Sequence, residues 1–373
     1  MINLKDIEEK DEAITHILKT MVDEDWSDVH ISPNLRITAE VSLQFTPITE
    51  LPITRDEAFE LCDAIYGSDT GSAKILSGQD LDFDKEIKYK VKGDSLTTPH
   101  RFRVNITSIT SRGSICPAIS IRKLYADIPK WSDFNFEEYI WDNFRPENGM
   151  IIVTGPTGSG KSTLLASGIR RIIEERQNEK IVTLEDPIEY TYEKYNNIHS
   201  FVEQSSKSTN FKDFQTPMKS ILRRKPSIVM VGEARDKETI RASLYVAQTG
   251  HLVYTTMHTN GVPETFKRMI SEFPIDEQHS RLADIVTNTR MIVSQQIHRS
   301  TEGKRVAIRE ILVITPTVKS YLEKADVTNI ASVARKLTDK FGQSMAAHAA
   351  QMVEKGLLRQ DQYEQIAQEF KNN

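Results

Sequence analysis

The chain has 373 residues, which is too long for one ordinary hydrophobic core and favours two domains. Its hydrophobic (38%) and charged (27%) fractions are typical of a globular protein. The net charge of −5 argues against a chain whose main task is to grip nucleic acid, because phosphate binding needs a basic surface. Two cysteines, Cys62 and Cys116, are too few for a disulfide framework or a four-cysteine zinc site. The sequence shows neither the charged start and apolar stretch of a signal peptide nor an apolar run of about 18 residues that would cross a membrane.

The first third of the chain has the pattern of an α+β module. Apolar residues at three- and four-residue spacing predict a first helix: Ile14, Ile17, Leu18, Met21 and Val22. A second helix is predicted over 54–66, and short alternating runs predict strands over 29–32, 36–48, 86–91, 101–109 and 115–124. Strands clustered in this way favour an antiparallel sheet with helices on one side. Because the stretch around Pro129 reads as a linker, we predict a first domain over 1–127, a linker over 128–136 and a second domain over 137–373.

From Met150 onward, apolar runs alternate with helical or irregular stretches. Four short, nearly continuous apolar runs lie at 150–155, 180–186, 227–233 and 251–258. Such runs are typical of parallel strands that are covered on both faces. Between the last two runs, a helix is predicted to begin at an Asp236 N-cap and to end at Gly250. After His298 the chain is expected to be mostly helical, so the second domain is predicted to be an α/β domain with a parallel sheet.

The segment GPTGSGKST joins the first of these runs to a helical stretch. Its spacing fits the phosphate-binding pattern G-x-x-x-x-G-K-[ST], with Lys161 predicted to reach the β- and γ-phosphates and Ser162 to hold Mg²⁺. A glycine-rich turn alone often marks only a tight corner, but the flanking strand and helix are the context that the motif requires. The predicted nucleotide-binding residues are Gly155, Pro156, Thr157, Gly158, Ser159, Gly160, Lys161, Ser162 and Thr163.

Ionisable residues stand at the ends of the other three apolar runs. The second run ends in Glu185 and Asp186, with Glu189 just beyond it; the third ends in Glu233 and the fourth in His258. In open parallel sheets, ligands bind beyond the carboxyl ends of the strands. Any one of these side chains could be a solvated surface charge. Their convergence beside a phosphate-binding loop is the arrangement expected of a catalytic site.

Hydrolysis of a γ-phosphate needs Mg²⁺, a group that orients the attacking water, and positive charge on the transferred oxygens. We therefore predict that Glu233 contacts Mg²⁺ or its water, that Glu189 polarises the attacking water, and that His258 donates to a phosphate oxygen. His251 precedes His258 by seven residues and falls at the opposite end of the same strand, about 20 Å away at ~3.3 Å per residue. For His251 a structural role is as well supported as a catalytic one.

Four ordered segments carry a family resemblance: GPTGSGKST, LEDPIEY, VGEARD and TGHLVYTTMHT. They resemble the Walker A, Asp, Walker B and His boxes of the secretion and pilus-retraction ATPases. SDVHIS, RFRVN and RGSICPAISIRKL are similar to the N-terminal domain of the PilT-like branch, and SQQIHRSTEGKRVAIREIL is similar to its C-terminal part. The resemblance thus runs from about Trp26 to Leu358. The compact length and the lack of a zinc module separate the chain from the general-secretion and pilus-assembly branches, and it is most similar to the DotB-type ATPases of type IVB secretion systems.

The resemblance implies a PAS-like α+β N-terminal domain, a RecA-like P-loop ATPase domain, and a homohexameric ring that hydrolyses ATP with Mg²⁺. It also implies a cytoplasmic protein, peripherally associated with the inner membrane through components of a secretion machine, with no direct binding of nucleic acid. The family usually has Asp where this chain has Ser227. That position precedes Glu233 by six residues, about 20 Å along an extended strand, so it is too far away to contact Mg²⁺.

Carried over position by position, the resemblance makes Glu189 the catalytic base and Glu233 the Walker B glutamate, with Glu185 and Asp186 as further nucleotide contacts. It places His251 and His258 together in the His box. Four arginines of the first domain fall where family arginines approach the nucleotide: Arg101, Arg103, Arg112 and Arg122. Of these, Arg112 and Arg122 are the predicted catalytic cations, delivered from a neighbouring subunit.

Two classes of function remain open. The first is an ATPase that powers macromolecular transport, by secretion, conjugation or pilus retraction. The second is a nucleic-acid-translocating motor on the same core, which the acidic net charge disfavours. A GTPase switch is a poorer third alternative, because the guanine-reading motif N-K-x-D does not occur.

Overall fold

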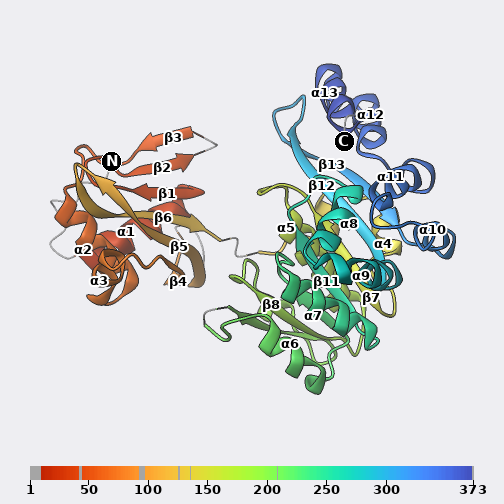
Figure 1. Ribbon diagram of the computed structural model, residues 1–373. Coiled ribbons are helices and arrows are strands. Elements are labelled where there is room, and N and C mark those ends of the chain that lie inside the picture. The colour runs from red at the N-terminus through yellow and green to blue at the C-terminus, as the bar shows by residue number, and fades with distance from the viewer. Residues whose placement is uncertain are drawn as a thin grey trace. The chain divides into compact units, whose positions relative to one another are not determined.

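The computed structural model describes residues 10–41, 44–91, 97–124, 127–134, 136–207 and 209–371. The chain forms two compact units, Met1–Asp127 and Ile128–Asn373 (Figure 1). Both cysteines are free and buried. Within the described ranges, no helix combines the length and apolar character needed to cross a bilayer.

The first unit is an antiparallel sheet in the order β3-β2-β1-β6-β5-β4, with three helices on one face (Figure 1). Alternate residues of β5 explain this arrangement, because Phe102, Val104 and Ile106 enter the core while Arg101 and Arg103 point to the other face. The elements are α1 (Lys10–Asp23), β1 (Asp28–Ile31), β2 (Thr38–Val41), β3 (Gln44–Pro47), α2 (Arg55–Tyr66), α3 (Thr70–Leu76), β4 (Leu81–Tyr89), β5 (Thr98–Ser111) and β6 (Ser114–Lys123).

The antiparallel sheet and the helices α1 and α2 follow the sequence prediction, but three details differ. The predicted strand over 36–48 is a hairpin of β2 and β3, β4 begins at Leu81 rather than at residue 86, and α3 was not predicted. Helix α2 is well marked in the sequence because Thr54 and Glu57 form a reciprocal capping box. Its C-cap, Gly67, has φ of 79°.

The second unit is built on a seven-stranded sheet in the order β13-β12-β7-β11-β10-β8-β9. Neighbouring strands are parallel except for β12 and β13, which form an antiparallel hairpin. The strands are β7 (Gly149–Thr154), β8 (Lys180–Glu185), β9 (Phe201–Ser206), β10 (Ile228–Val231), β11 (Leu252–Met257), β12 (Thr289–Arg299) and β13 (Arg305–Val313). The helices are α4 (Glu138–Asp142), α5 (Lys161–Glu175), α6 (Gln215–Ile221), α7 (Lys237–Gln248), α8 (Val262–Ser271), α9 (Ile275–Asn288), α10 (Pro316–Leu322), α11 (Ile330–Phe341), α12 (Met345–Glu354) and α13 (Gln360–Lys371).

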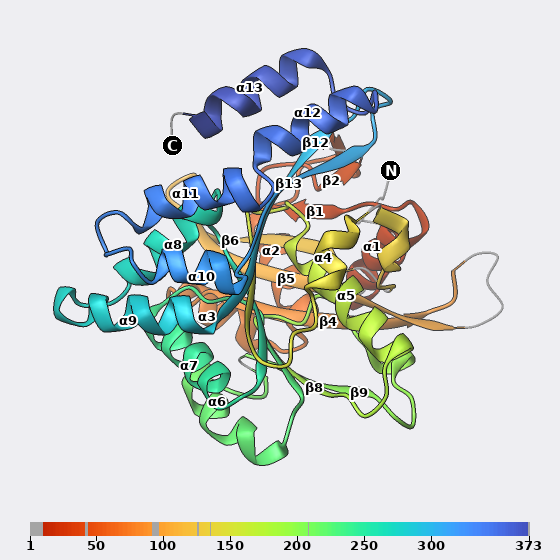
Figure 2. The same ribbon diagram turned by 90° about the vertical axis from the view of Figure 1, so that its right-hand side faces the viewer.

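Helices cover both faces of this sheet, as the continuous apolar runs predict. In β7, Ile151 and Val153 belong to a core shared with α5, whereas Met150 and Ile152 belong to a second core shared with α7, α8 and α9. The helices α12 and α13 pack beside the outer part of the β12–β13 hairpin, where Ile308 joins their small core (Figure 2). The prediction of mostly helical structure after His298 missed β13, because that strand is recognisable only through its pairing with β12.

The two edges of the second sheet are finished differently. At one edge, β9 carries Glu203, whose carboxylate forms ion pairs with Lys180 and Arg224. At the other edge, Ile311 of β13 exchanges two backbone hydrogen bonds with Gln343, at 2.8 and 2.9 Å.

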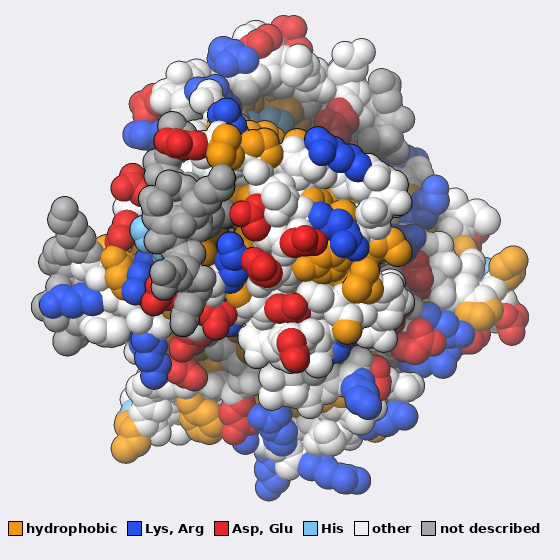
Figure 3. Space-filling view, turned by 90° about the vertical axis from the view of Figure 1, so that its left-hand side faces the viewer, with side chains coloured by type: hydrophobic (Ala, Val, Ile, Leu, Met, Phe, Trp, Pro, Cys, Tyr) orange, Lys and Arg blue, Asp and Glu red, His pale blue; other side chains and the backbone are white. Residues whose placement is uncertain are grey.

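Acidic and basic side chains are interspersed on the face of the molecule shown in Figure 3, which is the left-hand side of Figure 1.

The structure corrects the prediction of a linker over 128–136. The described residues of this segment pack into the second unit instead. Ile128 is 1% exposed and Trp131 is 6% exposed, and both belong to the core around α5. The Trp131 ring lies 4.4 Å from the Phe136 ring and 5.4 Å from the Phe144 ring, measured between centroids. Pro129 and the polar residues around it gave the segment the composition of a linker, although its apolar residues anchor it.

Helix α5 approaches Phe144 so closely that it has room only for glycine at position 168. A Cβ added at Gly168 would lie 2.3 Å from Cε1 of Phe144, whose side chain is fully buried. We predict that Gly168→Ala lowers the free energy of unfolding by about 1–2 kcal/mol, because so close a contact places the overpacking cost at the upper end of about 1–3 kcal/mol and helix propensity offsets only ~1 kcal/mol of it. Chemical denaturation would measure this change. Adding Phe144→Leu should recover part of the loss, and a single Gly168→Ala variant as stable as the wild type would contradict the prediction.

Candidate nucleotide-binding site

The loop of residues 155–160 connects the buried strand β7 to the first turn of α5. Gly155 and Gly160 have φ of 142° and 79°, a backbone region that favours glycine. Gly160 is the N-cap of α5, so the unpaired N–H groups and partial positive charge of the helix start at the loop. The predicted strand–loop–helix context of the motif is therefore present.

Lys161 is buried at the start of α5 and bonded to its own loop. Its Nζ donates to the carbonyl oxygens of Gly155 and Pro156, at 2.9 and 3.0 Å. Burial lowers the pKa of the Lys161 ammonium, and the nearby carboxylates of Glu233 and Glu189 partly offset that shift. The carboxylates that act on Lys161 thus come from the segments that follow two other strands, β8 and β10.

Glu233 and His258 meet at the ends of the adjacent strands β10 and β11. His258 Nε2 lies 3.3 Å from Oε1 of Glu233, and Arg235 Nε lies 2.6 Å from the same oxygen. The two strand ends are also joined by the Thr256 hydroxyl, which donates to the Gly232 carbonyl at 2.6 Å. The structure thus brings together the Glu233 and His258 side chains that the sequence predicts to act together.

The acidic segment after β8 divides its carboxylates between different surroundings. Glu185 is buried and accepts hydrogen bonds from Thr183 Oγ1 at 2.6 Å and Gln204 Nε2 at 3.0 Å. Asp186 pairs with Lys207 at 2.9 Å. Asp186 and Glu189 are both exposed, and Glu189 also acts electrostatically on Lys161. Glu185 and Asp186 are engaged within the acidic segment and its neighbour β9.

A hydrogen bond fastens the acidic segment to the P-loop helix. The hydroxyls of Tyr190 and Thr163 lie 2.9 Å apart, and the Tyr190 ring is buried. Glu189 precedes Tyr190 directly, so this bond fixes its distance from the first turn of α5. Thr163, predicted to contact the nucleotide, therefore also has a structural partner.

His251 and Ser227 lie at the amino ends of β11 and β10, at the end of the sheet away from the P-loop. The His251 carbonyl accepts from Gly149 N at 3.0 Å, and its ring lies 3.1 Å from the Thr249 hydroxyl. Within this chain, the length of β11 separates His251 from the P-loop. The predicted nucleotide contact of His251 stays a prediction. Ser227 Oγ donates to Glu179 at 2.5 Å, far from the catalytic edge as expected.

The four predicted arginines belong to the first unit. Arg101 pairs with Asp84, Arg103 pairs with Asp82, and Arg122 pairs with Asp28 at 2.8 Å. The Arg122 side chain is still 62% exposed. Arg112 is exposed in the turn between β5 and β6, with φ of 49°. Their predicted contact with a nucleotide stays a prediction.

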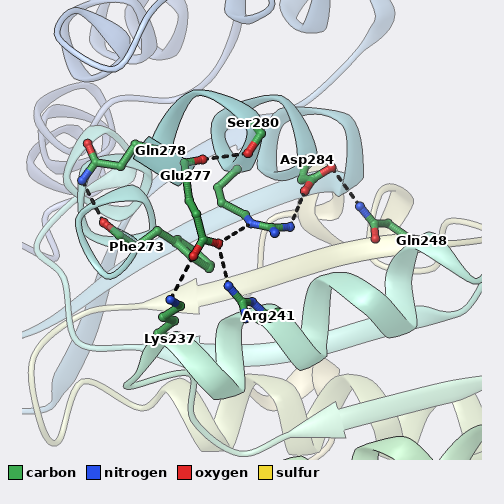
Figure 4. Close-up of polar contacts among 9 residues, drawn as sticks. Lys237, Arg241, Gln248, Phe273, Glu277, Gln278, Ser280 and Asp284 are labelled. Carbon is green, nitrogen blue, oxygen red and sulfur yellow. Dashed lines mark hydrogen bonds and ion pairs between the residues drawn. The ribbon is translucent and has the colours of Figure 1, made fainter. Parts of the chain in front are cut away.

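Helix α7, which follows Glu233 and Arg235, is held to α9 by an ion-pair network centred on Glu277 (Figure 4). Lys237 and Arg241 of α7 contact the Glu277 carboxylate at 3.1 and 2.6 Å, and Arg281 contacts it at 3.4 Å. The hydrogen bond from Lys237 is the main reason that the pKa of Glu277 lies below its usual range. The network orients the helix that begins just after the Walker B segment.

Sequence reasoning missed one residue at the loop, Gln295 of β12, whose amide Nε2 donates to the Ser159 carbonyl. The signal was present in the segment SQQIHR, which the family resemblance included without a role. Among the described residues, no group of three or more His, Cys, Asp or Glu could hold a metal ion alone.

Comparison with known proteins decides the family. The family described as "Type II/IV secretion system protein" matches residues 3–365. The chain belongs to this family. A twitching motility protein of Neisseria gonorrhoeae is 34% identical over 335 residues, which cover 90% of this chain and 84% of that protein.

Two solved structures place the chain among the PilT/DotB-like secretion ATPases. The ATPase DotB of Legionella pneumophila has a TM-score of 0.84 and 35% identity, covering 96% of this chain and 95% of that one. The pilus retraction motor PilT, solved with bound ADP, has a TM-score of 0.77 and 27% identity, covering 95% and 96%. The parallel-rich mixed sheet and these neighbours fit a RecA-like ATPase, whereas the PAS-like assignment of the first unit stays a prediction.

The buried Glu185 predicts a pH-dependent stability. Burial raises its pKa to about 7 from a reference of 4.5, so as the pH rises the unfolded chain releases this proton before the folded chain does. Stability from the protonated carboxyl is full below about pH 4.5 and is lost as the pH rises to about 7, a change of roughly 3 kcal/mol. We expect Glu185→Gln to remove this dependence.

Urea denaturation of both proteins at pH 5 and pH 8 would measure the effect. The stability of the wild type relative to Glu185→Gln should be lower at pH 8 than at pH 5. The exposed Glu193, in the same segment, provides Glu193→Gln as a matched control. A difference between wild type and Glu185→Gln that is the same at both pH values would refute the prediction.

Proposed function

We propose that this chain is a Mg²⁺-dependent ATPase that drives macromolecular transport through a type IV secretion system of the IVB kind. The observation that carries the proposal is the common end of β7, β10 and β11, where the P-loop, Glu233 and His258 follow strands in register. The bond between Tyr190 and Thr163 holds the neighbouring Glu189 near the same helix start. A helix start with a lysine and carboxylates nearby is suited to a polyphosphate with a bound cation. The likeness to an ATPase of known structure supports the same reaction.

In this proposal the loop N–H groups and Lys161 bind the ATP phosphates, and Lys161 exchanges its bonds to Gly155 and Pro156 for phosphate oxygens. A magnesium ion at a nucleotide takes most of its ligands from phosphates and water. The residues that would hold it are Ser162, at the first turn of α5, and Glu233, through its carboxylate or a water. When bound, Mg²⁺ would neutralise developing charge on the transferred phosphoryl group.

The remaining residues complete the reaction from the strand ends. Glu189, exposed beside the loop, accepts a proton from the attacking water. His258, oriented by Glu233, donates to a phosphate oxygen. We propose that the chain acts as a homohexamer, in which Arg112 and Arg122 of one copy reach the nucleotide of a neighbouring copy. A cation supplied in this way contributes roughly 10³–10⁵-fold to the rate in related phosphoryl transfer.

A pilus-retraction motor is the second candidate, and the likeness to a twitching motility protein and to PilT favours it. A nucleic-acid motor is less well supported because the net charge is −5. We place the protein in the cytoplasm, attached to the inner membrane through its machine. Purification from cells with its bound partners separates these alternatives. Secretion components support the proposal, whereas pilus components or DNA-stimulated ATP turnover contradict it.

Lys161→Ala should lower ATP turnover by about 10²–10³-fold, because it removes the cation aimed at the phosphates. The rate of phosphate release with Mg²⁺-ATP measures this effect, and thermal melting checks that the protein stays folded. Lys304→Ala is a matched control, because the Lys304 side chain is 80% exposed in the β12–β13 turn. A folded Lys161→Ala protein with more than a tenth of wild-type activity would exclude the assigned site.

Glu189→Gln should keep ATP binding and lose about 10²–10⁴-fold in turnover, because the amide cannot take the proton of the attacking water. Calorimetric titration with Mg²⁺-ATP and phosphate release together separate binding from turnover. Glu185→Gln and Glu233→Gln form the comparison set. If Glu189→Gln retains turnover while one of the other two loses it, the base is the residue whose replacement stops the reaction.

A further inference from the structure

The P-loop packs closely against Gln295 of the neighbouring strand β12. The register of β12 and β7 pairs Ser294 with Thr154, so Gln295 lies alongside the first loop residue, Gly155. A Cβ added at Gly155 would come within 2.1 Å of the Gln295 carbonyl oxygen, and one added at Gly160 within 2.9 Å of its side-chain nitrogen. Both ends of the loop are therefore packed directly against Gln295, which leaves no space for larger residues.

The Gln295 side chain is also bonded in a fixed orientation. Its Nε2 donates to the Ser159 carbonyl, and its Oε1 accepts from Arg309 Nε at 2.7 Å. An arginine side chain can only donate hydrogen bonds, so the amide oxygen must face Arg309 and the amide nitrogen must face the loop. Gln295 is 2% exposed and Arg309 is 3% exposed, so water does not compete for these bonds.

Arg309 is in turn held by the buried His348 and the partly buried Glu137. Its Nη1 contacts Glu137 Oε2 at 2.6 Å, and the other carboxylate oxygen of Glu137 lies 3.1 Å from His348 Nε2. His348 Nδ1 accepts from the Arg309 backbone N–H at 2.9 Å, so Nε2 carries the proton that faces Glu137. The Arg309 guanidinium also lies 4.6 Å from the Phe136 ring centroid. A buried ion pair is tolerated only when it is well bonded, as this one is.

The geometry of the peptide bond gives this arrangement a consequence for phosphate binding. In a trans peptide the C=O and N–H groups point in opposite directions. The Ser159 carbonyl points to Gln295, so the N–H of Gly160 in the same peptide points away from β12. Loop N–H groups that point inward are the donors that cradle a phosphate. A change at Gln295 would free this peptide to rotate and would turn that donor away.

We propose that Gln295 is a positioning residue for the P-loop, which aims the Gly160 N–H through its bond to the Ser159 carbonyl. Arg309, held by Glu137 and His348, fixes the orientation of the Gln295 amide. The inference rests on the proposed function in that it takes the loop to be a nucleotide site. It adds a chain of contacts that runs from the loop through Gln295 and Arg309 to Glu137, just before α4.

The test is the affinity of the full-length protein for Mg²⁺-ATP, measured by calorimetry well below the melting temperature. Gln295→Met keeps the size but removes both hydrogen bonds, and should weaken binding about 5–10-fold. Gln295→Glu keeps the bond to Arg309 but sets an acceptor against the Ser159 carbonyl, and should weaken binding about tenfold or more. Gln296→Met is the matched control, because Gln296 neighbours Gln295 in β12 and contacts His298 instead. It should change affinity less than about twofold.

A merely structural role for Gln295 predicts lower melting temperatures with unchanged affinity of the folded protein, and that result would overturn the proposal. An equal loss of affinity in Gln296→Met would overturn it as well. If Gln295→Glu fails to fold, Gln295→Met decides the question by the same criterion. Glu137→Gln, which does not touch the loop, should weaken binding about 2–5-fold through Arg309. A wild-type protein that does not bind Mg²⁺-ATP contradicts the proposed function itself, whereas wild-type binding that both Gln295 variants retain contradicts this inference alone.

Discussion

The parallel register of β7, β11 and β10 is the constraint on which the candidate site depends. Thr154 pairs with Met257 and Val231 pairs with Thr255, so the three strands end at the same edge. The P-loop, His258 and Glu233 follow these ends within three residues, and no long side chain has to span the distance between them. The apolar runs set this register because each strand buries both faces, and a slip would expose part of two cores.

Charges at this edge are arranged so that each one has an opposite charge or a dipole nearby. Lys161 is largely desolvated, and without Glu189 and Glu233 its ammonium would be still more costly to bury. Glu233 is in turn contacted by Arg235 and His258. The positive and negative charges at this end of the sheet are therefore close to equal. Bound phosphates and magnesium would change the net charge there and shift the positions of these side chains. Such responsiveness suits a site that alternates between two charge states during turnover.

Local sequence signals predicted the parts of the structure that local interactions determine. The helix over 54–66, the N-cap of Asp236 and the buried runs of β7, β8, β10 and β11 were all predicted from the sequence. What the sequence did not disclose depends on partners far away in the chain. The buried Glu185 accepts a hydrogen bond from Gln204 of β9. That strand is polar and has no apolar run from which it could be predicted.

The same limit applies to Gln295, Ile128 and Trp131. In the sequence, Gln295 is an ordinary polar residue of β12. Its role depends on Ser159, 136 residues away in the chain, and on Arg309, 14 residues away. Ile128 and Trp131 lie in a segment whose composition is typical of a linker. Their role as core residues follows only from their packing against α5. The PAS-like nature of the first unit and the nucleotide contacts of its arginines stay predictions.

The polar edge strand β9 has a consequence for how copies of this chain can associate. An edge strand offers unpaired backbone groups to any other strand, and exposed edges are sites of aggregation unless charge protects them. Glu203, with Lys180 and Arg224 beside it, would have to lose its ion pairs and its water before a second strand could dock there. Sheet-to-sheet extension along β9 is therefore disfavoured. Contacts between copies at β9 would therefore use side-chain surfaces, which can separate and rejoin more readily than a continuous sheet.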